Sequence, residues 1–183
     1  YEDLKNNYYS FGFTKPISIN FPSAAFGLMN AKETVSDREL ASLGYGYGLK
    51  VSPFQLTAAY STFANNGIRK EFKLLMNDEV TSKRIISKIS ADHTLEALKQ
   101  VVKIGTGKKA DIKGFSEGGK TGTVHRTISG SGYAKDLYRA SFVGIAPLSD
   151  ESLTIFVSIE DPGLNAYSGG MVAAPLFAEI AES

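Results

Sequence analysis

The stretch Gly114-Phe-Ser-Glu-Gly-Gly-Lys-Thr-Gly-Thr123 decides between two folds, because it matches two unrelated chemical patterns. Gly114, Gly119, Lys120 and Thr121 fit G-x-x-x-x-G-K-[ST], a loop that binds nucleotide phosphates through its backbone N–H groups. From Lys120 onward, the same residues spell Lys-Thr-Gly-Thr, a motif that other proteins carry on a strand. A loop and a strand need different neighbours, so the flanking sequence discriminates between them.

The flanks of this stretch do not suit a phosphate-binding loop, which follows a buried strand and leads directly into a helix. Residues 108–114 are too charged for a buried parallel strand, and residues 124–132 are too rich in glycine and β-branched side chains for a helix. One feature still favours nucleotide binding: residues 153–161 form an apolar stretch ending in two acids, as a magnesium-binding strand does. A glycine-rich turn before an ordinary strand is a further alternative.

The composition is that of a globular protein with no polyanionic partner. The chain has 183 residues, 43% of them hydrophobic, and its 20 Lys and Arg against 19 Asp and Glu give a net charge of +1. This length suits one domain or part of a larger one. The near-neutral charge argues against a nucleic acid partner. With no cysteine and two histidines, we expect no metal site and no cofactor.

No membrane-spanning segment is expected within the chain. Its longest uncharged stretch, residues 51–68, contains Ser52, Gln55, Thr57, Asn65 and Asn66 and is too polar to cross a bilayer. The chain opens without Met and with Leu4, Tyr8 and Phe11 at helical spacing, as if entered partway through a helix that ends near Gly12. We therefore expect a cut edge here, without a signal peptide or anchor.

Three further helices are predicted. The best marked is capped by Ser52, with a capping box completed by Gln55, and ends at residues 65–67. Its small polar face predicts burial on most sides. A second begins at Ser90 or Asp92 and ends at Gly105, and a terminal helix covers residues 172–181. Residues 16–22 are expected to be extended, residues 23–36 to form a loop, and residues 70–90 to form a charged surface excursion with a short strand at 84–86.

The last third of the sequence predicts three strands, at residues 121–127, 138–146 and 153–159. Residues 147–150 supply a turn, so the second and third strands should pair in antiparallel fashion. In the third, apolar residues occupy one face while Phe156 occupies the other, which predicts a central strand covered by helices on both sides. The expected fold class is α+β.

Residues 43–49 alternate glycine with Tyr45 and Tyr47. The glycines permit a tight turn, while the rings either pack in the core or contact a ligand. Core packing is the more frequent role of aromatic side chains, and we favour it here.

The order of these features resembles class B penicillin-binding proteins. The matching landmarks cover almost the whole chain: residues 44–49 (GYGYGL), 52–60 (SPFQLTAAY), 65–67 (NNG), 105–110 (GTGKKA), 119–123 (GKTGT), 142–147 (FVGIAP), 161–162 (DP), 167–170 (YSGG) and 174–177 (APLF). The resemblance implies a β-lactamase/transpeptidase-like fold, in which helices pack on an antiparallel sheet edged by the Lys120 strand.

Two of the three catalytic motifs of this family are missing. The nucleophilic serine lies in S-x-x-K, and no serine here is followed by Lys three positions on. The second motif, S-x-N, is matched only in letters by Ser18-Ile-Asn20, which precedes every other landmark, and we reject it. The resemblance therefore implies that residues 1–183 are the C-terminal portion of a transpeptidase domain whose N-terminal portion carries the nucleophile. Alone, this portion should be inactive.

The resemblance also implies roles for the motif that is present. The Thr123 N–H would form half of an oxyanion hole, with the substrate peptide paired alongside the strand. Thr121 and Thr123 would offer hydroxyls to the substrate carboxylate, and Lys120 would hold the second-motif serine and favour anionic ligands. Gly122 would leave room for the substrate backbone. These four residues form the expected catalytic strand.

Residues beyond the motif are expected to border the substrate. His125 stands where many relatives have a basic residue, so it could attract the carboxylate, although a solvated histidine is the more frequent case. Arg126 could serve instead, and the sequence does not decide between them. Tyr167, Gly169 and Gly170 resemble a turn that forms a wall of the site. His125, Tyr167, Gly169 and Gly170 are therefore assigned to substrate binding.

The same resemblance implies partners and a location. An intact enzyme of this kind cross-links peptidoglycan stem peptides in septal wall synthesis, is acylated by β-lactams, works with other division proteins and faces the periplasm from the inner membrane. Without its N-terminal portion, the chain would expose apolar surface and could self-associate. Two alternatives remain: a non-catalytic module that binds a carboxylate-bearing peptide, and a nucleotide-binding domain.

Overall fold

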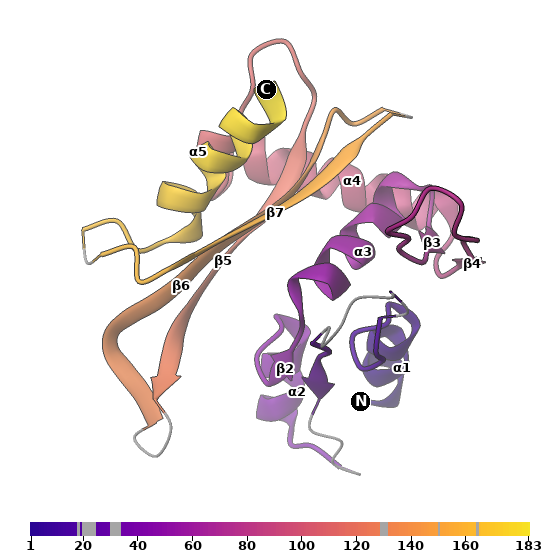
Figure 1. The fold of residues 1–183 in the computed structure, drawn as a ribbon. Helices are drawn as coiled ribbons and strands as arrows, with labels where there is room; N and C mark the ends of the chain where they lie inside the picture. Colours follow the sequence, from indigo (N-terminus) through magenta and orange to yellow (C-terminus); the bar gives the residue numbers. More distant parts are fainter. Residues whose placement is uncertain (18, 20–24, 30–33, 129–131, 150, 164) are drawn as a thin grey trace.

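A computed structural model of the chain describes residues 1–17, 19, 25–29, 34–128, 132–149, 151–163 and 165–183 (Figure 1). Ser18 and Asn20, on which the rejected S-x-N match depends, lie outside the described residues. So does most of the predicted extended segment 16–22, together with parts of the predicted loop 23–36.

A three-stranded antiparallel sheet organises the fold, with strands β5 (Gly118–Ile128), β6 (Gly132–Ala146) and β7 (Leu153–Glu160). The three predicted strands and the antiparallel turn between the last two are confirmed. Helices cover both faces of the third strand, as predicted, but this strand is not central among the described strands, because β6 lies between β5 and β7. The apolar periodicity of a strand reports which faces are covered, and it does not report how many strands flank it.

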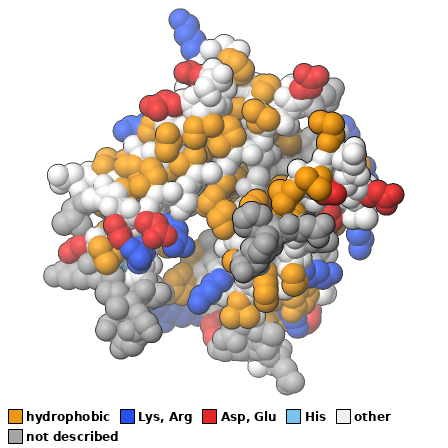
Figure 2. All heavy atoms as spheres, viewed as in Figure 1, with side chains coloured by type: hydrophobic (Ala, Val, Ile, Leu, Met, Phe, Trp, Pro, Cys, Tyr) orange, Lys and Arg blue, Asp and Glu red, His pale blue; other side chains and the backbone are white. Residues whose placement is uncertain are grey.

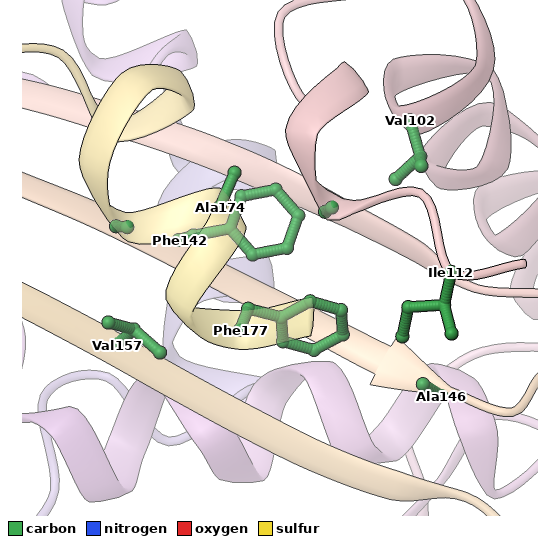
Figure 3. Close-up of a cluster of buried hydrophobic side chains, with 9 residues drawn as sticks. Val102, Ile112, Phe142, Ala146, Val157, Ala174 and Phe177 are labelled. Atoms are coloured by element: carbon green, nitrogen blue, oxygen red, sulfur yellow. The ribbon is translucent and has the colours of Figure 1, made fainter. Parts of the chain in front are cut away.

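Helix α5 (Gly169–Glu182) crosses one face of the sheet and covers the main core (Figure 1). The rings of Phe142 from β6 and Phe177 from α5 lie 5.0 Å apart and are fully buried. Figure 3 shows them with the smaller side chains that surround them: Val102, Ile112, Ala146, Val157 and Ala174. The terminal helix is thus confirmed, and it begins three residues before the predicted start.

Helices α3 (Pro53–Ala64) and α4 (Lys88–Lys103) cover the opposite face, so the sheet is the middle of three layers (Figure 1). The predicted capping box of α3 is present between Ser52 and Gln55. The predicted burial on most sides holds from Gln55 to Ala64, where every residue is buried or half-buried, whereas Pro53 and Phe54 in the first turn are exposed. The expected cap of α4 is also wrong: Ser87 caps it, accepting a hydrogen bond from the Ser90 backbone N–H.

The remaining elements are short and, apart from the 3-10 turn η1, which packs against α5, they lie to one side of the sheet (Figure 1). They are α1 (Glu2–Ser10), β1 (Leu28–Met29), α2 (Asp37–Gly44), β2 (Leu49–Lys50), β3 (Ile68–Lys70), β4 (Ser82–Arg84) and the 3-10 turn η1 (Lys108–Ala110). The predicted opening helix is confirmed as α1. Gln55 of α3 holds the segment that follows α1, since its side-chain amide donates to the carbonyls of Gly12, Phe13 and Lys15.

Two features of this region differ from the sequence-based expectation. Helix α2 was not predicted, although Ser36 and Glu39 form a complete capping box that marks its start. Tyr45 and Tyr47 do not pack in the core: they are 76% and 52% exposed. Gly46 between them and Gly48 after them have positive φ angles of 89° and 86°, which lead the chain along the surface after α2 with both rings outward. None of the described helices is long and apolar enough to cross a membrane.

Candidate active site

The Lys120–Thr123 segment lies within strand β5, at the edge of the sheet formed by the described strands. Its register with β6 pairs Lys120 with Val143 and Thr123 with Ala140. A phosphate-binding loop would instead curl and start a helix at this point. The strand geometry therefore excludes the nucleotide-binding interpretation and leaves one backbone edge of β5 without a partner strand in the described part of the sheet.

The hydroxyl groups of the two threonines are held in place from the α5 side. Thr121 Oγ1 and Thr106 Oγ1 lie 2.8 Å apart, and the backbone N–H of Gly169 donates to Thr123 Oγ1 at 3.0 Å. Lys120 Nζ lies on the exposed part of the strand and donates to the Thr121 carbonyl at 2.9 Å. The contacts with Thr106 and Gly169 fix the orientation of the Thr121 and Thr123 hydroxyls, which is what a preorganised binding site requires.

Thr106 belongs to this site and was not singled out among the predicted site residues. It follows the end of α4 within the Gly105-Thr-Gly107 stretch. The signal available in the sequence was that stretch itself, which is one of the landmarks of the family resemblance. Its pairing with Thr121, fifteen residues on, is a tertiary contact that no local pattern reports.

Gly122 faces the side of the sheet opposite to Thr121 and Thr123, because neighbouring residues of a strand alternate. A Cβ atom there would lie 2.5 Å from Ser141 Oγ. The structure thus provides a reason for glycine that was not expected from the sequence. The Ser141 side chain on β6 occupies the space that a Gly122 side chain would need. This reason is separate from the expected need to admit a substrate backbone.

Gly169 and Gly170 form the first turn of α5 and not the separate turn that was predicted. They permit very close contact with the sheet: a Cβ on Gly169 would lie 2.2 Å from the Ser141 carbonyl oxygen and 2.6 Å from that of Gly122. A Cβ on Gly170 would lie 2.2 Å from the Thr106 carbonyl oxygen. The N-terminus of α5 therefore packs directly against the strand that carries Lys120–Thr123.

An aromatic row continues the site toward the far end of β5. The ring centroids of His125 and Tyr138 are 4.4 Å apart, and those of Tyr138 and Tyr167 are 4.5 Å apart and stacked. His125 is thus not simply a solvated side chain, since it packs on Tyr138. Tyr167 remains 42% exposed, so the row presents a surface beside the N-terminus of α5.

Arg126 and the two acids at the end of β7 neutralise one another. Arg126 forms ion pairs with Asp161 and Glu160, and Arg139 forms a second ion pair with Glu160. The Arg139 hydrogen bond and charge lower the pKa of Glu160 below its usual value. The acids that could have suggested a magnesium site are therefore engaged by arginines. Among the described residues, no group of three or more His, Asp or Glu could hold a metal ion.

Together, these features define a class of protein. A sheet between helical layers, with Lys-Thr-Gly-Thr on its edge strand and the N-terminus of the last helix against that strand, is the arrangement expected of the β-lactamase/transpeptidase type. Of the assigned residues, Thr121, Gly122, Thr123, Gly169 and Gly170 come together around the start of α5, and Lys120 precedes them on β5. His125 and Tyr167 lie along the adjoining aromatic row.

Comparisons with known proteins identify the family within this class. The penicillin binding protein transpeptidase domain matches residues 1–182. A probable peptidoglycan D,D-transpeptidase, PbpC of Pseudomonas aeruginosa, is 37% identical over 171 residues, which cover 92% of this chain and 30% of that protein. The peptidoglycan D,D-transpeptidase FtsI of Buchnera aphidicola is 32% identical, over 97% of this chain and 32% of its own length. The chain therefore belongs to the penicillin-binding protein transpeptidase family.

Solved structures agree with this assignment. The transpeptidase domain of Burkholderia pseudomallei penicillin-binding protein 3 superposes with a TM-score of 0.88 at 34% identity, covering 99% of this chain and 56% of that one. Penicillin-binding protein 3 of Mycobacterium tuberculosis, complexed with aztreonam, gives a TM-score of 0.86 at 27% identity and covers 100% and 45%. The predicted fold class is confirmed. The chain spans about a third of the length of the curated relatives (30% and 32%).

Proposed function

We propose that this chain is the C-terminal portion of the transpeptidase domain of a serine-type peptidoglycan D,D-transpeptidase. Residues 1–183 would supply the Lys120–Thr123 strand, and a portion upstream in the full-length protein would supply the S-x-x-K serine and the S-x-N motif. The family membership and the share of each relative that is covered support this division. The observation that carries the proposal is the Lys-Thr-Gly-Thr segment on an edge strand beside the N-terminus of α5.

The proposed reaction is an acyl transfer in two steps. The serine oxygen attacks the carbonyl carbon of the penultimate D-Ala of a stem peptide, and the bond to the terminal D-Ala breaks, so that this residue leaves as the free amino acid. An amine of a second peptidoglycan strand then attacks the acyl-serine carbonyl carbon. The bond to the serine oxygen breaks, and the proton lost by the amine returns to that oxygen. Both steps pass through a tetrahedral oxyanion, for which the Thr123 N–H would supply one donor.

The contacts within the site suit this role. The substrate backbone would pair with the open edge of β5 as an added strand, which provides affinity through main-chain hydrogen bonds. Thr121 and Thr123 would donate to its terminal carboxylate from hydroxyls already oriented by Thr106 and Gly169. Lys120, the first and exposed residue of the motif, would hold the serine of the S-x-N motif and add positive charge. The aromatic row ending at Tyr167 would form a wall of the site.

The substrates and location follow from the same proposal. We infer that the full-length protein binds peptidoglycan stem peptides and β-lactams, acts in septal wall synthesis with other division proteins and works at the periplasmic face of the inner membrane. Relatives named FtsI and penicillin-binding protein 3 support the septal role, and the aztreonam complex of one of them supports β-lactam binding.

Labelled penicillin tests the proposal. The full-length protein should gain a covalent penicilloyl group, visible as a mass increase and localised by peptide mapping to a serine upstream of Tyr1. The 183-residue chain under the same conditions should gain no covalent mass. A full-length protein that binds penicillin only reversibly would support a non-catalytic carboxylate-binding module instead, and acylation of a serine within residues 1–183 would refute the proposed division.

Self-association of the chain alone is a second testable part of the proposal. Figure 2 shows hydrophobic side chains gathered on the viewed face over the region of α5 and β7. The exposed apolar residues of these elements include Leu153, Leu176 and Ile180. If the upstream portion normally covers this surface, the chain alone should form oligomers. Light scattering at increasing concentration would show a rising mass, whereas a strict monomer would contradict this expectation.

A further inference from the structure

Glu117, the residue immediately before β5, is buried in an unusual way. Its side chain has 0% exposure, and neither carboxylate oxygen has a hydrogen-bond partner. A buried ionised carboxylate without hydrogen bonds is strongly disfavoured, so such a group either finds a compensating cation or takes up a proton. The proposed reaction assigns no role to Glu117.

One lysine faces two acids at this position. Lys103 Nζ, from the last turn of α4, lies 3.9 Å from Glu117 Oε1 and 2.6 Å from Asp111 Oδ1. With both acids ionised, the cluster of Glu117, Lys103 and Asp111 carries one excess negative charge. Burial is the main cause that raises the pKa of Glu117 above its ordinary value of 4.5; Lys103 lowers the pKa and Asp111 raises it. A proton on Glu117 would make the cluster neutral.

The backbone next to Glu117 has no room to absorb a change. A Cβ on Gly118 would lie 3.0 Å from the backbone nitrogen of Lys99 in α4, and a Cβ on Gly119 would lie 2.4 Å from Phe142 Cζ. The strand therefore enters the sheet wedged between α4 and the ring of Phe142. Only these two closely packed glycines separate Glu117 from Lys120, so a displacement at Glu117 would act on the start of the motif.

We propose that Glu117 is a positioning residue for the Lys120–Thr123 strand, and that the Glu117–Lys103–Asp111 cluster binds a proton that holds the start of β5 against α4. Loss of that proton leaves one excess negative charge on the cluster, with the Glu117 carboxylate fully buried. This charge favours opening of the start of β5 and entry of water. The catalytic meaning of this inference rests on the proposed function, whereas the structural part does not.

The direction of the pH effect follows from proton binding. If the folded protein holds a proton on Glu117 that the unfolded chain has already released, stability falls as the pH rises above about 4.5. Opening of the strand start should follow the same direction. Glu117→Gln has nearly the same shape and cannot lose a proton, so it should keep the closed state at all pH values.

Hydrogen exchange of the full-length protein tests this, with protection of the peptide covering residues 117–123 corrected for intrinsic exchange. In the wild type, protection should fall several-fold from about pH 5 to about pH 9. In Glu117→Gln it should stay high and change little. Asp92→Asn is the matched control, because Asp92 is an exposed acid paired with Lys88 on the same helix, and it should follow the wild type. A Glu117→Gln profile identical to that of the wild type would overturn the inference.

Lys103→Met provides a second test, which also decides the case if Glu117→Gln does not fold. Removing the cation should make the proton harder to lose, so the fall in protection should shift to higher pH. An unshifted fall would overturn the inference. Penicillin acylation measured in parallel separates the two proposals: an unacylated wild type with the expected exchange profile sinks only the proposed function, and an acylated wild type with pH-independent exchange sinks only this inference.

Discussion

The two halves of strand β5 are built differently. The first, enclosed half begins with the buried Gly118 and Gly119, which let the backbone touch α4 on one face and Phe142 on the other; Thr121 is half-buried, and the Lys120 side chain reaches solvent. The second half, Thr123 to Arg126, is largely exposed, with Val124 at 56% exposure and Arg126 held by surface ion pairs. The proposed catalytic motif spans the boundary between the two halves.

This difference suggests how one strand can be both rigid and accessible. The enclosed half anchors the backbone through close packing, which tolerates little displacement. The exposed half leaves the edge open to a ligand. If this division is correct, substitutions around the enclosed half should reduce stability strongly, and substitutions in the exposed half should have small effects on stability. Substitutions in the Lys120–Thr123 motif should mainly reduce the rate of penicillin acylation.

The largest effect is expected from Phe142→Ala. Phe142 is fully buried between α5 and the enclosed half of β5, and removing such a ring costs about 3 to 5 kcal/mol of unfolding free energy. Val124→Ala, in the exposed half of β5, should change it by less than about 0.5 kcal/mol. Urea unfolding of the two variants measures both values. Equal losses would show that the two halves do not differ in packing.

Gly122→Val should act on the motif and so affect acylation. A Cβ collides with Ser141 Oγ at 2.5 Å, and the two methyl groups of Val extend farther along the face of the strand. We expect penicillin acylation of the full-length protein to slow by about a hundredfold or more, equivalent to about 2.8 kcal/mol. Gly122→Ala, which rotation of the Ser141 hydroxyl can accommodate, should lose much less. A Gly122→Val protein with normal acylation would refute the assignment of this strand.

Gly119→Ala probes the enclosed half with a single methyl group. The added Cβ would lie 2.4 Å from Phe142 Cζ and 2.7 Å from the Val143 carbonyl oxygen. Overpacking of this kind costs about 1 to 3 kcal/mol. Gly44→Ala is the matched control, because nothing lies within 4 Å of a Cβ there. Thermal unfolding should show a clear decrease for Gly119→Ala only, and an unchanged midpoint would mean that the wedge is loose.

The smallest effect is expected from Arg126→Ala at the exposed end of β5. Its ion pairs with Glu160 and Asp161 are partly exposed, and such pairs contribute about 0 to 1 kcal/mol. The loss should shrink further as salt is added, because salt screens exposed charges. Unfolding measured at low and high ionic strength checks this. A loss comparable to that of Phe142→Ala would show that the exposed half is a structural anchor.

Local sequence patterns predicted much of the fold. The capping box at Ser52 and Gln55 marked α3, and alternating apolar residues marked the three strands of the sheet. The flanks of Lys120 distinguished a strand from a phosphate-binding loop. These features depend on interactions between residues close in sequence, and such interactions act in the same way whatever surrounds them. The capping box at Ser36 and Glu39 is a local signal of the same kind for α2.

Other features depended on contacts between distant segments. The position of β7 at the edge of the described sheet, the outward orientation of Tyr45 and Tyr47, the Thr106–Thr121 pair and the burial of Glu117 against Lys103 have no local signature. Each depends on which element packs on which face. The sequence by itself therefore determined the Lys120–Thr123 strand and the family, because a short motif with its flanks marks the strand and the order of landmarks along the chain marks the family. Only the tertiary structure decided what surrounds the strand, because burial and charge pairing arise when separate elements meet.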